Sequence, residues 1–247
     1  MKKIFMAVLL LLLMAAPAMA KITFQLPSNF TQDDFKNLSR DLGLAISYIP
    51  LAPAEPLGGA LPGFDIGVEV TGVTYNKNAS YIQKAVTNPS DLPSTLPEAK
   101  AHVQVGLPFI PIDLGIVYGT APGSDVKLVG YELKWAILKG STIAPAVAIR
   151  GAYTKLSGID VFDISTKSLD LSISKGFTAL TPYAGIGEVW ITSTPNTNVP
   201  TIPLTKEDIT ETKGFLGCKL SLGLINFVAE ADFAKVNEYS LRMNLHF

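Results

Sequence analysis

The 247-residue chain has little of the chemistry that enzymes and cross-linked secreted domains need. Cys218 is its only cysteine, so an internal disulfide is impossible and a cysteine-based metal site is excluded. The two histidines, His102 and His246, are scattered and form no metal-ligand pattern. His102 has no serine, aspartate or asparagine partner at a spacing typical of a catalytic site. We therefore expect no enzymatic activity, no metal site and no cofactor.

A large excess of charge of either sign is also missing. Lysine and arginine number 20 against 21 aspartates and glutamates. Without a basic stripe, we expect no binding to nucleic acid. No glycine-rich loop follows a strand and opens a helix, so nothing supports nucleotide binding. Only 17% of residues are charged whereas 48% are hydrophobic, which excludes a disordered or fully solvated protein.

Long hydrophobic runs are absent after residue 20, so no segment reaches the ~20 apolar residues that a membrane helix needs. The one apolar run is N-terminal. Lys2 and Lys3 precede the apolar residues 4–16, and residues 18–20 (AMA) form a small-x-small cleavage pattern. The sequence therefore predicts a cleaved bacterial secretory signal over residues 1–20. No cysteine stands directly after this run, which argues against a lipid anchor.

Strand-like alternation fills the chain from residue 64 onward. Ten segments of period-two alternation are separated by turn residues: about 64–75, 99–108, 110–120, 126–138, 143–155, 163–175, 180–193, 213–223, 227–235 and 238–247. This pattern is the weak but regular signature of a transmembrane β-barrel. Residues 64–247 are therefore predicted to form an all-β, antiparallel barrel of about ten strands. A barrel of twelve strands is the alternative if residues 21–26 and 44–51 join the sheet.

The lengths of the connections favour the same topology. If the first strand rises from the periplasm, the connection after each odd strand is external and the connection after each even strand is periplasmic. The two longest connections, about 76–98 and 194–212, both follow odd strands, and the connections after even strands are short. An even number of strands also returns the C-terminus to the periplasm.

The last strand has the clearest alternation. It places apolar side chains on one face and polar ones on the other; the apolar set is Tyr239, Leu241, Met243, Leu245 and Phe247. This strand resembles the C-terminal assembly signal of bacterial outer-membrane β-barrels, in which a terminal Phe follows apolar residues at every second position, with an aromatic residue eight positions earlier. The resemblance implies recognition by the outer-membrane assembly machinery and a place in the outer membrane of a Gram-negative bacterium. It identifies no subfamily.

The charged residues of the strands alternate with apolar ones. A charge that faces lipid near the bilayer midplane costs about 2–4 kcal/mol, so the charges are predicted to face the lumen. The candidates for lining the lumen are Asp65, Glu69, Glu132, Lys134, Arg150, Glu188, Lys219, Glu230, Asp232 and Arg242. Alternation is least clean over residues 180–193, where Glu188 shares its face with Trp190.

Residues 21–63 precede the barrel and contain one short helical pattern. Phe35, Leu38 and Leu42 recur at helical spacing after a threonine that can cap a helix, which predicts a helix over residues 32–42. This helix either plugs the barrel, with these three side chains packed on its wall, or extends into the periplasm. We favour the plug because a free helix of this length is marginal in water.

The function is less clearly indicated than the fold. Ten strands lie close to the eight-strand size at which side chains fill the interior, so the mixed charges either fill the lumen as ion pairs or line a narrow pore. We predict a narrow, porin-like channel or small-solute conduit. One alternative is a structural or adhesion barrel with a filled lumen, which acts through external loops 76–98 and 194–212. The other is a soluble periplasmic β-protein that binds an apolar ligand. The expected partners of the membrane protein are outer-membrane lipid, lipopolysaccharide and the assembly machinery.

Overall fold

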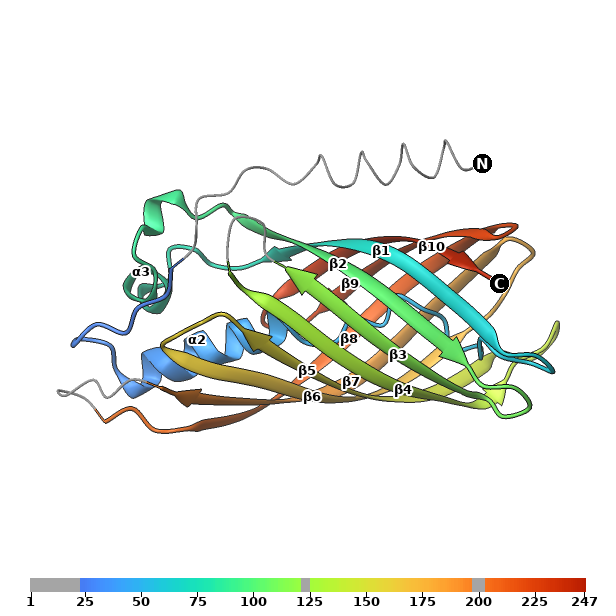
Figure 1. Ribbon diagram of the computed structural model, residues 1–247, viewed down its shortest axis with the longest axis horizontal. Coiled ribbons are helices and arrows are strands. Elements are labelled where there is room, and N and C mark those ends of the chain that lie inside the picture. The colour runs from blue at the N-terminus through green and yellow to red at the C-terminus, as the bar shows by residue number, and fades with distance from the viewer. Residues whose placement is uncertain (1–22, 121–124, 197–202) are drawn as a thin grey trace.

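Ten antiparallel strands form one closed barrel in the computed structural model, which describes residues 23–120, 125–196 and 203–247 (Figure 1). Consecutive strands are neighbours, and β1 pairs with β10 to close the sheet. The strands are β1 Gly63–Thr74, β2 Thr95–Gly106, β3 Ile112–Thr120, β4 Lys127–Lys139, β5 Ala146–Ser157, β6 Phe162–Ser174, β7 Leu180–Pro195, β8 Glu207–Leu222, β9 Ile225–Phe233 and β10 Asn237–His246. The predicted ten-stranded β-barrel is confirmed.

The seam of the barrel is formed by the first residues of β1 and the end of the chain. The amide of Phe64 donates to the carbonyl of Phe247 at 2.7 Å, and the amide of Phe247 donates back at 3.0 Å. Their rings stack with centroids 5.8 Å apart. Closure leaves no free sheet edge, so each strand satisfies its backbone groups within the sheet.

The alternative of twelve strands is wrong. Phe24 makes only an isolated bridge to Val86, and residues 46–57 belong to no strand. The latter segment contains three prolines, which lack the amide hydrogen that a sheet ladder needs. The predicted signal sequence, residues 1–20, lies outside the described part of the chain.

The two ends of the barrel differ. The end that holds Phe247 and the connections 107–111, 140–145, 175–179 and 223–224 is called the turn end here. The opposite end, called the helix end, holds the longest connection, residues 75–94 between β1 and β2, with α3 Ser80–Ala85 and the short 3₁₀ helix Pro89–Asp91. The loops expected over 76–98 and 194–212 are shorter than predicted, because β2 and β8 both extend toward this end.

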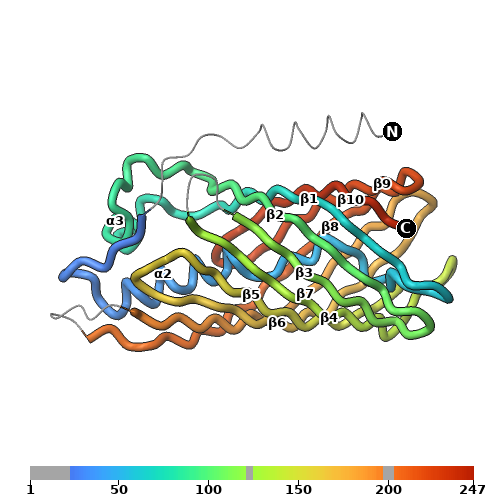
Figure 2. Tube along the Cα trace, viewed as in Figure 1, coloured from blue at the N-terminus to red at the C-terminus, as the bar shows by residue number. Residues whose placement is uncertain are grey.

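Helix α2, Gln32–Ala45, lies inside the barrel at the helix end (Figure 2). Thr31 and Asp34 form a capping box at its start, which satisfies two amides that the helix leaves free. The helix continues three residues past the predicted end. It passes through Gly43, where an added Cβ would lie 2.3 Å from Cγ2 of Ile191 on β7. Gly43 therefore allows the helix to approach the wall closely and does not end the helix.

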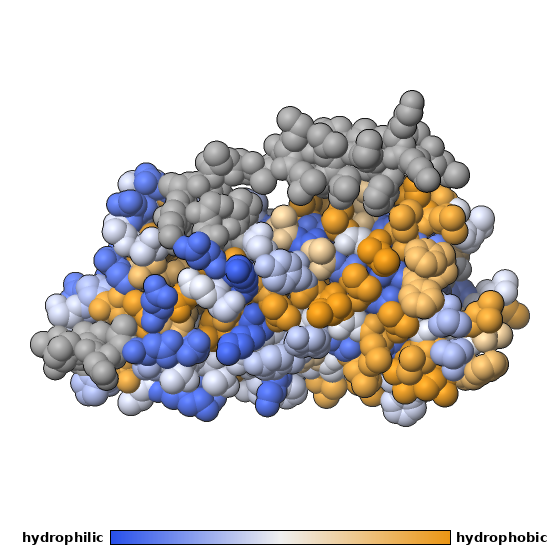
Figure 3. All heavy atoms as spheres, viewed as in Figure 1, coloured by the Kyte–Doolittle hydropathy of each residue, from blue (hydrophilic) through white to orange (hydrophobic). Residues whose placement is uncertain are grey.

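The outer surface divides into an apolar band and a polar rim. On β6, Leu169, Leu171 and Ile173 are each about half exposed and point outward, whereas Asp163 and Lys167 occupy the outward positions nearer the helix end. Figure 3 shows the same division, with hydrophobic residues gathered toward the turn end and hydrophilic ones toward the helix end. In the described ranges, no helix has both the length and the apolar character to cross a bilayer.

The interior reverses this order. Near the helix end, where the outer surface is polar, the wall packs an apolar core against α2; the rings of Phe35 and Phe162 meet edge to face at 5.9 Å. Inside the apolar band, the inward side chains are charged or polar and buried, among them Glu69, Glu132 and Arg150. The barrel thus has an apolar core beside α2. Its interior is polar at the level where its outer surface is apolar.

Candidate functional site

The lumen is occupied by the chain itself. After α2, residues 46–57 pass through the barrel to the turn end without forming a helix or a strand, and we call this segment the strap (Figure 2). Tyr48, Leu51 and Ala54 of the strap are each exposed by 2% or less. Its three prolines favour an extended backbone without internal hydrogen bonds. The strap therefore depends on the wall to satisfy its backbone groups.

Lysines of the wall bind carbonyl groups of the strap. Nζ of Lys213 on β8 donates to the carbonyl of Tyr48 at 2.5 Å. Nζ of Lys134 on β4 donates to the carbonyls of Pro53 at 3.1 Å and Glu55 at 2.8 Å. Charge-assisted hydrogen bonds of this kind are roughly twice as strong as neutral ones. Lys134, which was expected to line the lumen, instead binds the strap, and Lys213 binds it in the same way.

Carboxylates of the wall bind amide groups of the strap. The amide of Leu51 donates to Oε2 of Glu230 at 2.8 Å, and the amide of Leu57 donates to both oxygens of Asp113 at 3.1 Å. Oε2 of Glu230 also accepts a hydrogen bond from the hydroxyl of Tyr183 at 2.5 Å. Wall groups of both signs therefore bind carbonyls and amides of one segment that has no regular secondary structure.

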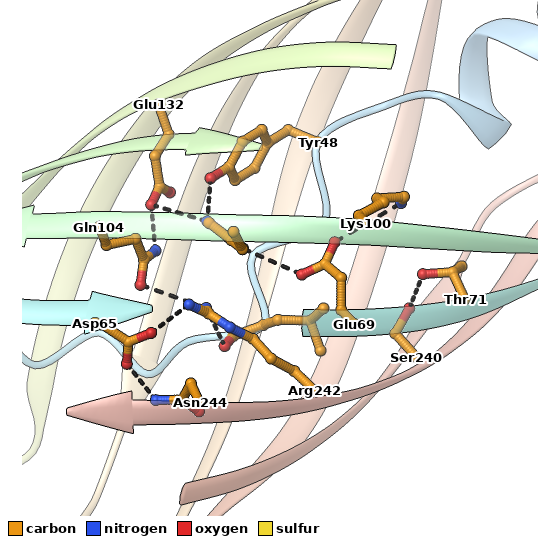
Figure 4. A network of polar contacts seen from close by, with 12 residues as sticks. Tyr48, Asp65, Glu69, Thr71, Lys100, Gln104, Glu132, Ser240, Arg242 and Asn244 are labelled. Carbon is orange, nitrogen blue, oxygen red and sulfur yellow. Dashed lines mark hydrogen bonds and ion pairs between the residues drawn. The ribbon is translucent and has the colours of Figure 1, made fainter. Parts of the chain in front are cut away.

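A buried chain of polar contacts joins the side chain of Tyr48 to the wall (Figure 4). The Tyr48 hydroxyl lies 2.6 Å from Nε2 of His102, and Nδ1 of the same ring lies 3.1 Å from Oε2 of Glu69. Oε1 of Glu132 lies 3.8 Å from the same Nε2, and Oε2 of Glu132 pairs with Nε of Arg150 at 2.7 Å. All five side chains are at least 95% buried. Because they are buried together, each charge depends on its partner.

A second group of contacts lies nearer the turn end. Arg242 on β10 pairs with Asp65 on β1, and Asp65 also accepts a hydrogen bond from Asn244 (Figure 4). Nη1 of Arg242 lies 3.4 Å from the carbonyl of Leu51 in the strap and 3.4 Å from Oε1 of Gln104. This group spans the β1–β10 seam and extends to the strap.

The structure places most of the expected lumen residues inside the barrel. Eight are buried and face inward: Asp65, Glu69, Glu132, Lys134, Arg150, Glu230, Asp232 and Arg242. Lys219 is partly buried at the turn end. Of the helix residues expected to pack on the wall, Phe35 and Leu38 are fully buried and Leu42 packs against the same core.

The assignment of Glu188 to the lumen is wrong. Glu188 lies on the outer face, where its Oε1 accepts a hydrogen bond from the Thr212 hydroxyl at 2.7 Å. The inward positions of β7 include Tyr183, Val189 and Ile191, which are at most 4% exposed. These side chains pack against buried apolar residues of the α2–strap segment, so at this level the apolar face points inward.

Lys100 and Lys213 were not among the residues predicted to line the lumen, although both are buried inside the barrel. Lys100 pairs with Glu98 at 3.1 Å, and Lys213 lies 3.6 Å from Asp232. Lys213 lies six residues before Lys219 on the same strand. Because residues an even number apart on a strand share a face, the assignment of Lys219 to the lumen also predicts an inward position for Lys213.

Contacts at the helix end join α2 to α3. Nζ of Lys84 lies 2.7 Å from Oδ2 of Asp34, and the Tyr81 hydroxyl donates to Asp41 at 2.5 Å. Burial alone would raise the pKa of Asp34, but hydrogen bonds from Lys84 and from the amide of Thr31 outweigh it and hold that pKa below its ordinary value. Burial raises the pKa of Asp41 despite its hydrogen bond from Tyr81.

Neither a metal-binding cluster nor a match to a known family indicates what the polar interior does. Over the residues that the structure describes, no group of three or more His, Cys, Asp or Glu side chains is arranged to hold a metal ion. No protein-family model and no curated protein matches the chain.

Solved structures do match, at low sequence identity. One is Ail, the attachment invasion locus protein of Yersinia pestis, with 9% identity and a TM-score of 0.34 over 75% of this chain and 97% of that chain. Another is Neisserial surface protein A, with 7% identity and a TM-score of 0.33 over 75% of this chain and 97% of that chain. A third is the translocator domain of autotransporter NalP from Neisseria meningitidis, with 9% identity and a TM-score of 0.40 over 87% of this chain and 95% of that chain. All three are bacterial outer-membrane β-barrels, and the likeness concerns the fold alone.

Proposed function

We propose that this chain is an outer-membrane β-barrel of a Gram-negative bacterium that acts through its external end, as a structural or adhesion protein, with its lumen closed by its own strap. The observation that carries this proposal is the binding of strap carbonyls by Lys134 and Lys213 and of strap amides by Asp113 and Glu230. These charges are the groups that an open channel would present to solute. The porin-like channel predicted from the sequence is therefore the second candidate.

A place in the membrane is supported by the outer surface. The apolar band exposes large side chains such as Leu171 and Leu216, which are 49% and 55% exposed. A continuous band of this kind is unfavourable in water but suits the hydrocarbon region of a bilayer. This observation favours the membrane over a soluble periplasmic protein, and makes lipid and lipopolysaccharide the expected surroundings.

The orientation follows from the two ends. Short turns and the C-terminus are typical of the periplasmic side of a barrel, so the turn end faces the periplasm and the helix end faces outward. The chain then enters the barrel from outside, since α2 lies at the helix end and the strap leads from it to β1. In the last strand, Tyr239, Leu241 and Phe247 are exposed on the outer face, where the assembly machinery would meet them.

The candidate contact surface lies at the external end. It comprises α3 and its neighbours in the connection 75–94, together with the extended ends of β7 and β8. Salt bridges and hydrogen bonds from Lys84 and Tyr81 fix α3 on α2, so α3 has a defined position. A rigid external element of this kind fits recognition better than conduction.

Labelling of single cysteines on intact cells tests this proposal. In a Cys218→Ser background, Ser80→Cys in α3 and Thr142→Cys in the β4–β5 turn each place one exposed thiol at one end of the barrel. We expect a membrane-impermeant maleimide to label the Ser80→Cys variant on intact cells and the Thr142→Cys variant only after permeabilisation. The opposite pattern, or recovery of the protein in the soluble periplasmic fraction, would contradict the proposal.

A further inference from the structure

A polar cavity lies between the strap and the wall at the turn end. Its volume is about 190 Å³, which is roughly six times the share of one water in the liquid. The polar side chains that line it include Glu55, Lys134, Lys219, Asn226, Asn244 and His246. The cavity is thus large enough for a small solute and is lined by groups that hydrogen-bond.

Most charges around the cavity are already compensated. Nζ of Lys134 lies 2.9 Å from Oδ2 of Asp113 and also donates to two strap carbonyls. Asp65 is paired with Arg242 and accepts a hydrogen bond from Asn244. These wall charges therefore have partners and need no ligand.

Two charges remain without a partner. Over the described residues, neither the ammonium of Lys219 nor the carboxylate of Glu55 makes a hydrogen bond or an ion pair, with each other or with another group. Glu55, Lys134 and Asp65 are the charged groups that act on Lys219 through space. The cavity thus presents one positive and one negative charge that do not touch.

Neutral hydrogen-bonding groups complete the lining. Oδ1 of Asn244 is buried and has no partner in the described structure. The side chains of Asn226 and His246 likewise line the cavity without a hydrogen bond to another described side chain. A buried polar group without a partner is costly, so these atoms favour a polar occupant.

We propose that this cavity binds a small zwitterion, a solute of free amino acid size with one carboxylate and one ammonium group. Its carboxylate pairs with Lys219 and its ammonium with Glu55, while Asn226, Asn244 and His246 hydrogen-bond to the remainder. A ligand with a single charge would leave Lys219 or Glu55 uncompensated in a partly buried site. Entry from the periplasm rests on the orientation proposed above, whereas binding itself does not.

Calorimetric titration of the refolded full-length protein in detergent tests this inference. The probes are L-serine as zwitterion, acetate as anion, ethylammonium as cation and glycerol as neutral polar solute. We expect saturable binding of L-serine and at least tenfold weaker binding of the other three. Lys219→Met and Glu55→Gln should each weaken the binding of L-serine at least tenfold, and Lys219→Arg should retain more of it than Lys219→Met.

Two outward-facing residues supply matched controls. Lys167→Met and Glu188→Gln remove the same charges outside the barrel, and both should bind L-serine as the unmodified protein does. A difference in gel mobility between unheated and heated samples checks that each variant is folded. Binding of acetate as tight as that of L-serine, to both the unmodified protein and Glu55→Gln, would overturn the inference in favour of an anion site. The absence of saturable binding of any probe would overturn it in favour of a water-filled vestibule. Neither result would alter the labelling pattern that tests the proposed function.

Discussion

The hydroxyl of Tyr48 lies 2.6 Å from Nε2 of His102, and this contact fixes the strap to the wall in the middle of the lumen. Tyr48 is 2% exposed and His102 is fully buried. The other ring nitrogen of His102 is engaged by Glu69 at 3.1 Å, so one imidazole connects the strap to a charge on β1. The strap is therefore part of the polar interior of the barrel.

Removing this hydroxyl should destabilise the barrel. Tyr48→Phe removes the hydrogen bond to the buried Nε2 of His102 and leaves it 3.8 Å from Oε1 of Glu132, which costs about 1–3 kcal/mol of the free energy of unfolding. Urea unfolding in detergent measures the loss. Tyr131→Phe is the control, because Tyr131 is 52% exposed on the outer face and should change stability little. Equal stability of Tyr48→Phe and the unmodified protein would contradict the account.

The fit of α2 against β7 should be sensitive to one methyl group. Gly43→Ala places a Cβ within 2.3 Å of Ile191 and should cost about 1–3 kcal/mol of stability, as overpacking does. Combining it with Ile191→Ala should cost less than the sum of the two single changes. Gly151→Ala is the control, because nothing lies within 4 Å of a Cβ there. Strict additivity in unfolding experiments would show that α2 does not pack as described.

Acid should weaken the contact between α2 and α3. The pKa of Asp34 is held below its ordinary value of 3.8, so the stabilisation is present above that value and is lost as pH falls through the lower pKa of the folded state. The difference in stability between the unmodified protein and Asp34→Asn should be below about 1 kcal/mol at neutral pH and should vanish in strong acid.

Asp41 supplies a contrast of opposite sign. Its pKa is raised, so ionised Asp41 opposes folding above its folded-state pKa, and this penalty disappears below pH 3.8. Asp41→Asn should therefore lose its relative advantage as pH falls. A pH-independent difference for both variants in unfolding experiments would contradict these assignments.

The N-terminal end of the described chain should lie outside the cell. Phe24 bridges Val86 in the connection between β1 and β2, and the strap then carries the chain through the barrel before β1. An epitope inserted between residues 22 and 23 should bind antibody on intact cells. The same epitope inserted after Gly223, in the β8–β9 turn, should bind only after permeabilisation. Detection of both epitopes only in permeabilised cells would mean that the strap does not pass through the lumen.

The alternation of the sequence was sufficient to predict the number of strands and most of their faces. Period-two patterns separate the apolar face of a strand from its polar face, so charges such as Arg150 and Arg242 were assigned correctly to the interior. The assignment of Glu188 failed because the apolar face of β7 turns inward beside α2. Alternation alone cannot show which face is inner once a helix enters the barrel.

The strap could not be predicted in the same way. Residues 46–57 have no helical or strand period, since Pro50, Pro53 and Pro56 interrupt both. Their course depends on the volume that ten strands enclose and on wall groups such as Lys213, which lie far away in the sequence. The sequence predicts the composition of the lumen but does not show that the chain itself occupies it.

Single-channel conductance in planar bilayers tests the closed lumen most directly. The full-length protein is compared with a variant that lacks residues 24–57, and both are first shown to be folded by the mobility of unheated samples. The account predicts no discrete current steps from the full-length protein, because the strap fills the lumen, and discrete steps from the variant. Discrete steps of equal size from both proteins would contradict it.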